Sequence, residues 1–221
     1  MTLPALSLLE TRVLGVLVEK QHTVPDAYPM TLNAIISGCN QKTSRDPVLS
    51  ASDAEVQATL DRLKGLSLVI ESSGGRVMRY AHNTERVLGV PSQAVALLTA
   101  LMLRGPQTVA ELRINSDRIH RFADTSSVEG FLHELAQRPA GPLARELPRQ
   151  PGTREARWVH LLSGAPAATS EPPADAAASD DLITAGELAA LKANVDDLQA
   201  EVAALKATVA ALCAELGIHR P

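Results

Sequence analysis

Residues 56–82 read VQATLDRLKGLSLVIESSGGRVMRYAH, and this stretch decides the fold of the chain. In its first part, Val56, Leu60 and Leu63 recur at the spacing of one face of an α-helix. Two short runs follow, one on each side of a Ser/Gly-rich turn at residues 72–75, which is the pattern of two antiparallel strands. The stretch therefore predicts a helix followed by a β-hairpin.

The same pattern recurs in the second half of the chain. Val128, Leu132 and Leu135 repeat the helical spacing 72 residues further on, and Trp158-Val159-His160 repeats the end of the first hairpin, Tyr80-Ala81-His82. An ordered set of elements that recurs indicates an internal repeat. A helix followed by a hairpin is typical of the third helix and wing of a winged helix-turn-helix domain. We therefore predict a mainly α fold with small β wings, made of two tandem winged helix-turn-helix domains.

Shorter signals mark the other helices and the domain boundaries. Helical spacing recurs in three segments ahead of these units, at residues 6–20, 32–39 and 92–103. Capping boxes, in which Ser or Thr is followed three residues later by Glu, predict three helix starts, at Ser52, Thr108 and Ser126. We assign the first winged-helix domain to residues 1–90 and the second to residues 91–163.

The chain changes character after residue 163. Residues 164–183 are rich in Ala, Pro, Ser and Asp, a composition typical of a disordered linker. In residues 184–217 apolar side chains alternate at spacings of three and four, with Leu at every d position, and this heptad pattern predicts a coiled-coil helix that favours a parallel homodimer. The predicted dimerisation residues are Leu188, Leu191, Val195, Leu198, Val202, Leu205, Val209, Leu212 and Leu216. The alternative is a single amphipathic helix that folds back on its own domain.

Composition limits the class of protein. Apolar residues make up 45% of the 221 residues and aromatic residues only 2%, so the cores must be aliphatic. The sequence has no charged and apolar leader and no run of about 18 apolar residues, so we expect a cytoplasmic protein with no membrane partner. Cys39 and Cys213 have no partner spacing, which fits a reducing compartment.

The charge is unevenly distributed along the chain, whose net charge is −4. Residues 1–90 hold nine Lys/Arg and nine Asp/Glu, residues 91–163 hold nine and seven, and residues 164–221 hold three and nine. A strongly basic nucleic-acid binder would have a clear positive excess. This chain has only locally basic loops.

Several strings of residues resemble the YceH-type family of bacterial proteins. The matching stretches are Glu10-Thr11-Arg12-Val13-Leu14-Gly15, Thr31-Leu32-Asn33-Ala34, Cys39-Asn40-Gln41-Lys42 continuing to Arg45-Asp46-Pro47-Val48, Leu103-Arg104-Gly105-Pro106-Gln107-Thr108, Glu111-Leu112-Arg113 and Leu147-Pro148-Arg149-Gln150-Pro151-Gly152. The resemblance covers the chain from about Leu8 to Gly164. It implies the tandem winged-helix fold and supplies no activity.

The basic residues that could contact nucleic acid lie in loops and wings. Outside its apolar stripe, the helix at residues 53–64 is acidic in its N-terminal half, and the helix at residues 127–135 carries no Lys or Arg. The candidate contacts to double-stranded DNA are Lys42, Arg45, Arg76, Arg79, Arg118, Arg121, Arg149, Arg154 and Arg157. Such residues contact phosphates without reading bases. Alternatively, many of them pair with neighbouring acidic residues, and Arg45 holds a buried turn through backbone carbonyls.

The sequence gives little support to catalysis. It contains no Gly-rich phosphate loop, no Ser/His/Asp spacing and no Cys/His metal set, so we expect a protein that is not an enzyme and has no catalytic residue, cofactor or metal. His82 and His160 occupy equivalent positions in the two hairpins, which favours a repeated packing role over a ligand role.

Two hypotheses of function follow. The first is a DNA-binding transcriptional regulator whose two chains are held together by the C-terminal zipper, because winged helices most often bind DNA. The second is a protein-interaction scaffold without DNA binding, similar to the dimeric accessory subunits of bacterial chromosome-condensing complexes. The fold favours the first hypothesis, whereas the neutral charge and the acidic third helices favour the second.

Overall fold

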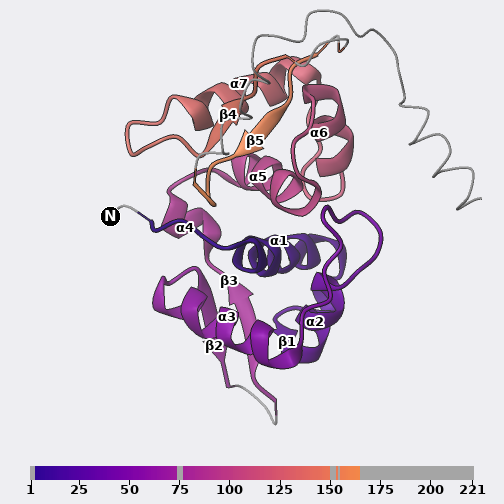
Figure 1. The fold of residues 1–221 in the computed structure, drawn as a ribbon, viewed down its shortest axis with the longest axis vertical. Coiled ribbons are helices and arrows are strands. Elements are labelled where there is room, and N and C mark those ends of the chain that lie inside the picture. The colour runs from indigo at the N-terminus through magenta and orange to yellow at the C-terminus, as the bar shows by residue number, and fades with distance from the viewer. Residues whose placement is uncertain (1–2, 74–76, 150–152, 154, 165–221) are drawn as a thin grey trace, which may run out of the picture. The chain divides into compact units, whose positions relative to one another are not determined.

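The computed structural model describes residues 3–73, 77–149, 153 and 155–164 (Figure 1). The predicted linker beyond residue 164, the coiled-coil helix at 184–217 and its nine dimerisation residues lie outside the described residues. Arg76 and Arg154 also lie outside them.

The first half of the described chain contains three helices and a small sheet. Helix α1 (Leu8–Thr23) is followed by a short 3-10 helix, η1 (Pro25–Ala27), and then by strand β1 (Met30–Thr31), helix α2 (Leu32–Cys39), helix α3 (Asp53–Gly65) and strands β2 (Val69–Ser72) and β3 (Arg79–His82). The sheet is antiparallel, with β3 between β1 and β2. In its register Met30 lies opposite Tyr80, and Val69 lies opposite His82.

The second half repeats this order after a short connecting helix. Helix α4 (Thr84–Leu88) leads to α5 (Ser92–Arg104), α6 (Val109–Ser116), α7 (Thr125–Ala136) and the antiparallel pair β4 (Ala144–Glu146) and β5 (Trp158–His160). An isolated bridge joins Gln107 to Trp158, just as β1 joins Met30 to Tyr80. The internal repeat therefore includes the segment before the second helix of each half.

The fold is mainly helical with small antiparallel sheets, which confirms that part of the predicted fold class. The capping boxes at Ser52 and Thr108 are present. The predicted helix start at Ser126 is wrong, because Asp124 adopts an extended backbone and its carboxylate accepts a hydrogen bond from Ser127 N at 2.7 Å. An aspartate in this position satisfies the free N–H groups of the first turn, so α7 begins at Thr125.

One aliphatic core runs through both halves. Helix α1 packs along α5 (Figure 1). Most apolar side chains of both helices are almost completely buried, Leu14, Leu17, Leu97 and Leu101 among them, whereas Leu8 at the start of α1 is exposed. The two helices approach closely at Gly15, where an added Cβ would lie 2.9 Å from Leu103 Cδ2. This contact between α1 and α5 places the loops of the first half beside those of the second.

The histidines at the ends of the two hairpins are held in their neutral form. Burial, together with the charge of His22, lowers the pKa of His82 to about 4, and burial alone lowers the pKa of His160 to about 4. His82 Nδ1 accepts a hydrogen bond from Thr84 N at 3.3 Å, and its Nε2 contacts the side-chain oxygen of Gln21. These contacts support the packing role of His82, whereas Nδ1 of His160 is buried without a hydrogen-bond partner among the described residues. The described residues contain no cluster of side chains that could hold a metal ion.

Stability should therefore fall in mildly acidic solution. Both imidazoles have folded-state pKa values of about 4, below the ordinary value of 6.5, so their contribution is complete above about pH 6.5 and is lost as the pH falls toward 4. We expect the urea midpoint to decrease between about pH 7 and about pH 5, a range above the ordinary pKa values of Asp and Glu. The double variant His82→Gln with His160→Gln should flatten this dependence. An equally steep dependence in that variant would show that other groups cause it.

Candidate functional site

Arg45 fixes the connection between α2 and α3. Its side chain is completely buried, and its guanidinium forms a bidentate ion pair with Glu19 of α1, with Nη2 at 2.6 Å from Oε2 and Nη1 at 3.3 Å from Oε1. Nε donates to the carbonyl oxygen of Gly38 at 3.2 Å. Burial alone would raise the pKa of Glu19, but the hydrogen bonds and charge of Arg45 outweigh burial and leave this pKa below its ordinary value. Arg45 therefore has a structural role in the folded chain, and its donors do not face solvent.

A second buried arginine holds the same connection from the other side. Arg12 of α1 is fully buried and donates to the carbonyl oxygens of Cys39 at 3.2 Å and Pro47 at 2.7 Å. Asp46 N donates to Leu103 O at the end of α5, at 2.8 Å. The connection is thereby fastened to helices of both halves. The sequence offers no local signal for this role of Arg12, because its partners are distant along the chain.

Three of the predicted nucleic-acid contacts are exposed but already have partners. Arg79 donates to Pro29 O at 2.7 Å, and Arg121 pairs with Asp117 at 3.1 Å. Arg157 pairs with Glu111 at 3.0 Å and also donates to Pro106 O. Only the pair of Arg121 with Asp117 joins an arginine to a neighbouring acidic residue, as in the alternative interpretation. Arg79 and Arg157 instead contact partners far along the chain.

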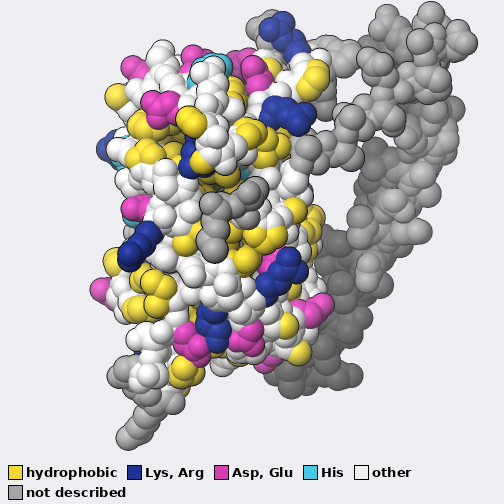
Figure 2. Space-filling model, turned by 90° about the vertical axis from the view of Figure 1, so that its left-hand side faces the viewer, with side chains coloured by type: hydrophobic (Ala, Val, Ile, Leu, Met, Phe, Trp, Pro, Cys, Tyr) yellow, Lys and Arg dark blue, Asp and Glu magenta, His cyan; other side chains and the backbone are white. Residues whose placement is uncertain are grey.

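Three other candidates are exposed, and no hydrogen bond or ion pair joins them to another described residue. They are Lys42, Arg118 and Arg149. They come from the α2–α3 connection, the α6–α7 connection and the segment after β4, so the structure does not gather them on one element. On the face shown in Figure 2, positive and negative side chains lie interspersed among exposed hydrophobic ones, without a continuous field of either sign.

The third helix of each half offers no free positive charge to a ligand. In α3, Arg62 pairs with the buried Glu10 at 2.8 Å, and Lys64 pairs with Asp61 at 2.9 Å and also with Glu71. Helix α7 contains no Lys or Arg, and its Glu129 and Glu134 are exposed. The outward faces of both helices are therefore neutral or acidic.

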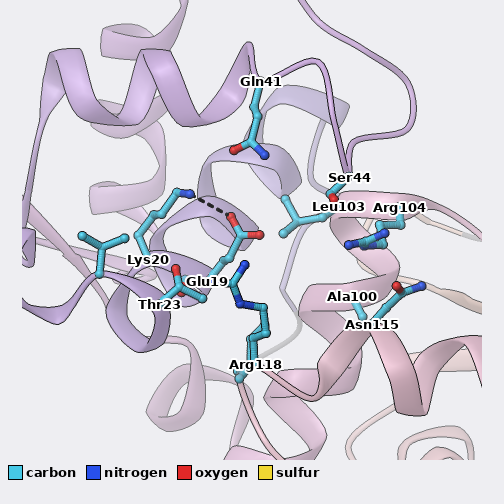
Figure 3. Close-up of a pocket in the computed structure, with 12 residues that line it drawn as sticks. Glu19, Lys20, Thr23, Gln41, Ser44, Ala100, Leu103, Arg104, Asn115 and Arg118 are labelled. Carbon is cyan, nitrogen blue, oxygen red and sulfur yellow. Dashed lines mark hydrogen bonds and ion pairs between the residues drawn. The ribbon is translucent and has the colours of Figure 1, made fainter.

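A hollow of about 170 Å³ lies where the two halves meet (Figure 3). Its walls come from the end of α1, the α2–α3 connection, the end of α5 and the segment from α6 to α7. Lys20, Arg104 and Arg118 supply positive charge, and Glu19 supplies the one negative charge. Of these four residues, sequence reasoning singled out only Arg118, because the others are distributed over separate helices that the sequence does not show to be neighbours.

No helix in the described part of the chain combines the length and the apolar character needed to cross a membrane.

Comparisons with known proteins identify the relatives of the chain. Residues 6–153 match a family model described as "Protein of unknown function, DUF480". A UPF0502 protein of Methylibium petroleiphilum is 63% identical over 216 residues, which cover 98% of this chain and 92% of that protein. UPF0502 proteins of Burkholderia orbicola and Dechloromonas aromatica are each 58% identical, over 95% and 90% of this chain and 89% and 91% of their own lengths. These matches confirm the predicted family resemblance.

The role of Arg45 can be tested within its own loop. Arg45→Ala leaves the partly buried carboxylate of Glu19 with only Lys20 as a partner, so it should lower the free energy of unfolding by about 2–3 kcal/mol. The matched control is Lys42→Ala, an exposed change in the same loop, which should stay within about 0.5 kcal/mol of the unmodified chain. Urea denaturation measures both. Equal effects of the two changes would contradict the structural role of Arg45.

Proposed function

This chain belongs to the bacterial family of DUF480 and UPF0502 proteins, and we propose that it is a tandem winged-helix protein that binds another protein and is not an enzyme. The order of elements supports the fold. Each half contains a helix, a short extended segment, two further helices and an antiparallel strand pair. This is the order found in winged helix-turn-helix domains, in which the third helix and the hairpin form the contact surface.

The charge of the third helices is the observation that carries the proposal. A helix that enters the major groove of DNA needs cationic or polar side chains directed at phosphates and base edges. In α3, Arg62 and Lys64 are committed to acidic partners, and α7 exposes Glu129 and Glu134 with no cation on the helix. DNA phosphates would be repelled from such faces. A protein partner with a basic surface would be attracted to them.

DNA binding through loops and hairpins is the second candidate. The free cations of Lys42, Arg118 and Arg149 favour it, because they could neutralise phosphates without reading bases. In this case the chain would be a dimeric transcriptional regulator with weak sequence discrimination of its own.

Binding to a random-sequence duplex separates the two candidates. The full-length chain should show no saturable fluorescence anisotropy change at low salt, because few free cations face outward. If it binds, and its affinity falls steeply between about 50 and 200 mM salt, several phosphates are contacted. That result would replace the protein-binding proposal with the DNA-binding one.

The protein-binding proposal also needs a positive test. Photo-crosslinking amino acids at Ala58 of α3 and His133 of α7 should capture one protein in cells, whereas one at the exposed Glu85 of α4 should not. The captured protein is then purified, and its affinity for the chain is measured directly. Glu129→Lys with Glu134→Lys should weaken this affinity by at least about tenfold, because opposite charges would become like charges across the interface. An unchanged affinity would exclude α7 from the interface.

We propose in addition that the chain is a homodimer held by residues 184–217. The support is the heptad pattern alone, since these residues lie outside the described part of the chain. A chain that ends at Ser163 should have half the solution mass of the full-length protein in analytical ultracentrifugation, after correction for the removed residues. If both are monomers, or both are dimers, the zipper is not the dimer contact.

A further inference from the structure

The hollow between the two halves has an unusual balance of charges. Glu19 is its one acidic group, and this carboxylate is already shared between Arg45, at 2.6 Å, and Lys20, at 3.5 Å. Arg104 and Arg118 also line the hollow, and within the described part of the chain neither side chain forms a hydrogen bond or ion pair. The walls therefore hold two more positive than negative charges, and the two guanidinium groups have unused donors.

Arg104 is the less exposed of these two arginines. It lies at the last residue of α5 and is only partly exposed. Burial and the charge of Arg45 both lower the pKa of Arg104, while Glu19 raises it. An arginine stays charged in any protein environment, so a positive charge is held near Arg45 with no carboxylate in contact. Such a partly desolvated cation is costly unless an anion accompanies it.

Acidic groups nearby do not remove this imbalance. Asp46 and Glu111 line a neighbouring hollow that shares Ser44, Arg104 and Asn115 with the first. Glu111 is already paired with Arg157 at 3.0 Å. Together the two hollows are lined by five basic and three acidic residues, so the excess of two positive charges is unchanged. The basic residues are Lys20, Arg45, Arg104, Arg118 and Arg157, and the acidic ones are Glu19, Asp46 and Glu111.

From this geometry we infer that the hollow binds a small oxyanion, a phosphate or a short dicarboxylate, between Lys20, Arg104 and Arg118. The planar guanidinium fork matches the paired oxygens of carboxylate and phosphate groups. The volume of about 170 Å³ lies below the range of about 300–1,000 Å³ typical of sites for drug-sized ligands. The site is concave, which suits a free ion better than the convex backbone of a DNA duplex.

An anion bound in the hollow would connect the two halves of the described chain. Lys20 comes from α1 of the first half, whereas Arg104 and Arg118 come from α5 and the α6–α7 connection of the second half (Figure 3). An anion held by all three would join the halves at the point where α1 packs on α5. Binding should therefore raise the melting temperature of the protein in proportion to the logarithm of ligand concentration once the site is saturated.

Calorimetric titration of the full-length chain with inorganic phosphate and with succinate tests the inference. At low ionic strength we expect saturable binding of at least one of the two at millimolar concentrations. Arg104→Gln and Arg118→Gln should each weaken it by at least about tenfold, since each removes a charged hydrogen-bond donor. The matched control is Arg121→Gln, which removes an exposed arginine that pairs with Asp117 outside the hollow. Its affinity should stay within about twofold of the unmodified chain.

Three results would overturn the inference. The first is no saturable binding of either anion to a chain whose melting curve shows that it is folded. The second is an equal loss of affinity in the Arg121→Gln control, which would indicate general surface charge. The third is that a short DNA duplex binds, that Arg104→Gln and Arg118→Gln weaken its binding, and that phosphate and succinate neither bind nor compete with it. This result would assign the two arginines to nucleic-acid binding. A negative DNA result leaves this inference standing, because the titration with phosphate and succinate measures binding of a small ion in the hollow, which does not require the chain to bind a DNA duplex.

Discussion

The buried ion pair between Arg45 and Glu19 is the interaction on which the arrangement of the two halves depends. Arg45 sits in a polar connection of the first half, and Glu19 lies on the helix that packs against the second half. The next residue, Asp46, uses its N–H to bind the carbonyl at the end of α5. Breaking a buried pair leaves an uncompensated charge, so this loop is held in one position. The same ion pair also neutralises one wall of the hollow between the halves.

Several basic side chains are occupied by contacts inside the protein, so the number of Lys and Arg residues does not measure the positive charge available to a ligand. Arg12 and Arg45 are buried with carbonyl and carboxylate partners, and Arg62 and Lys64 are committed to acids beside α3. A count of basic residues therefore overstates the positive charge that is free to meet a ligand. Free cations remain at exposed loops and around the hollow. This distribution favours small-anion binding at the hollow and protein binding at the third helices.

The internal repeat extends beyond the features that first revealed it. Tyr80 and Trp158 are buried at equivalent strand positions, and each lies opposite the segment that precedes the second helix of its half. His82 and His160 follow two residues later and are both kept neutral by burial. The halves differ in the α2–α3 connection, since two buried arginines, Arg12 and Arg45, hold it, whereas the described arginines that contact the α6–α7 connection, Arg113 and Arg121, are exposed.

The sequence by itself determined the features that depend on near neighbours. Helical spacing, two of the capping boxes and the recurrence of helix and hairpin are local, because backbone hydrogen bonds and caps join residues a few positions apart. One local prediction was wrong, because Asp124 and not Ser126 caps α7. The Asp124 carboxylate accepts a hydrogen bond from the backbone N–H of Ser127. Only the tertiary structure decided the role of Arg45, the partners of Arg79 and Arg157 in the hairpins, and the existence of the hollow. The contacts of these arginines rest on partners 26 to 51 residues away, and the hollow depends on how α1 packs on α5. No local pattern records either arrangement.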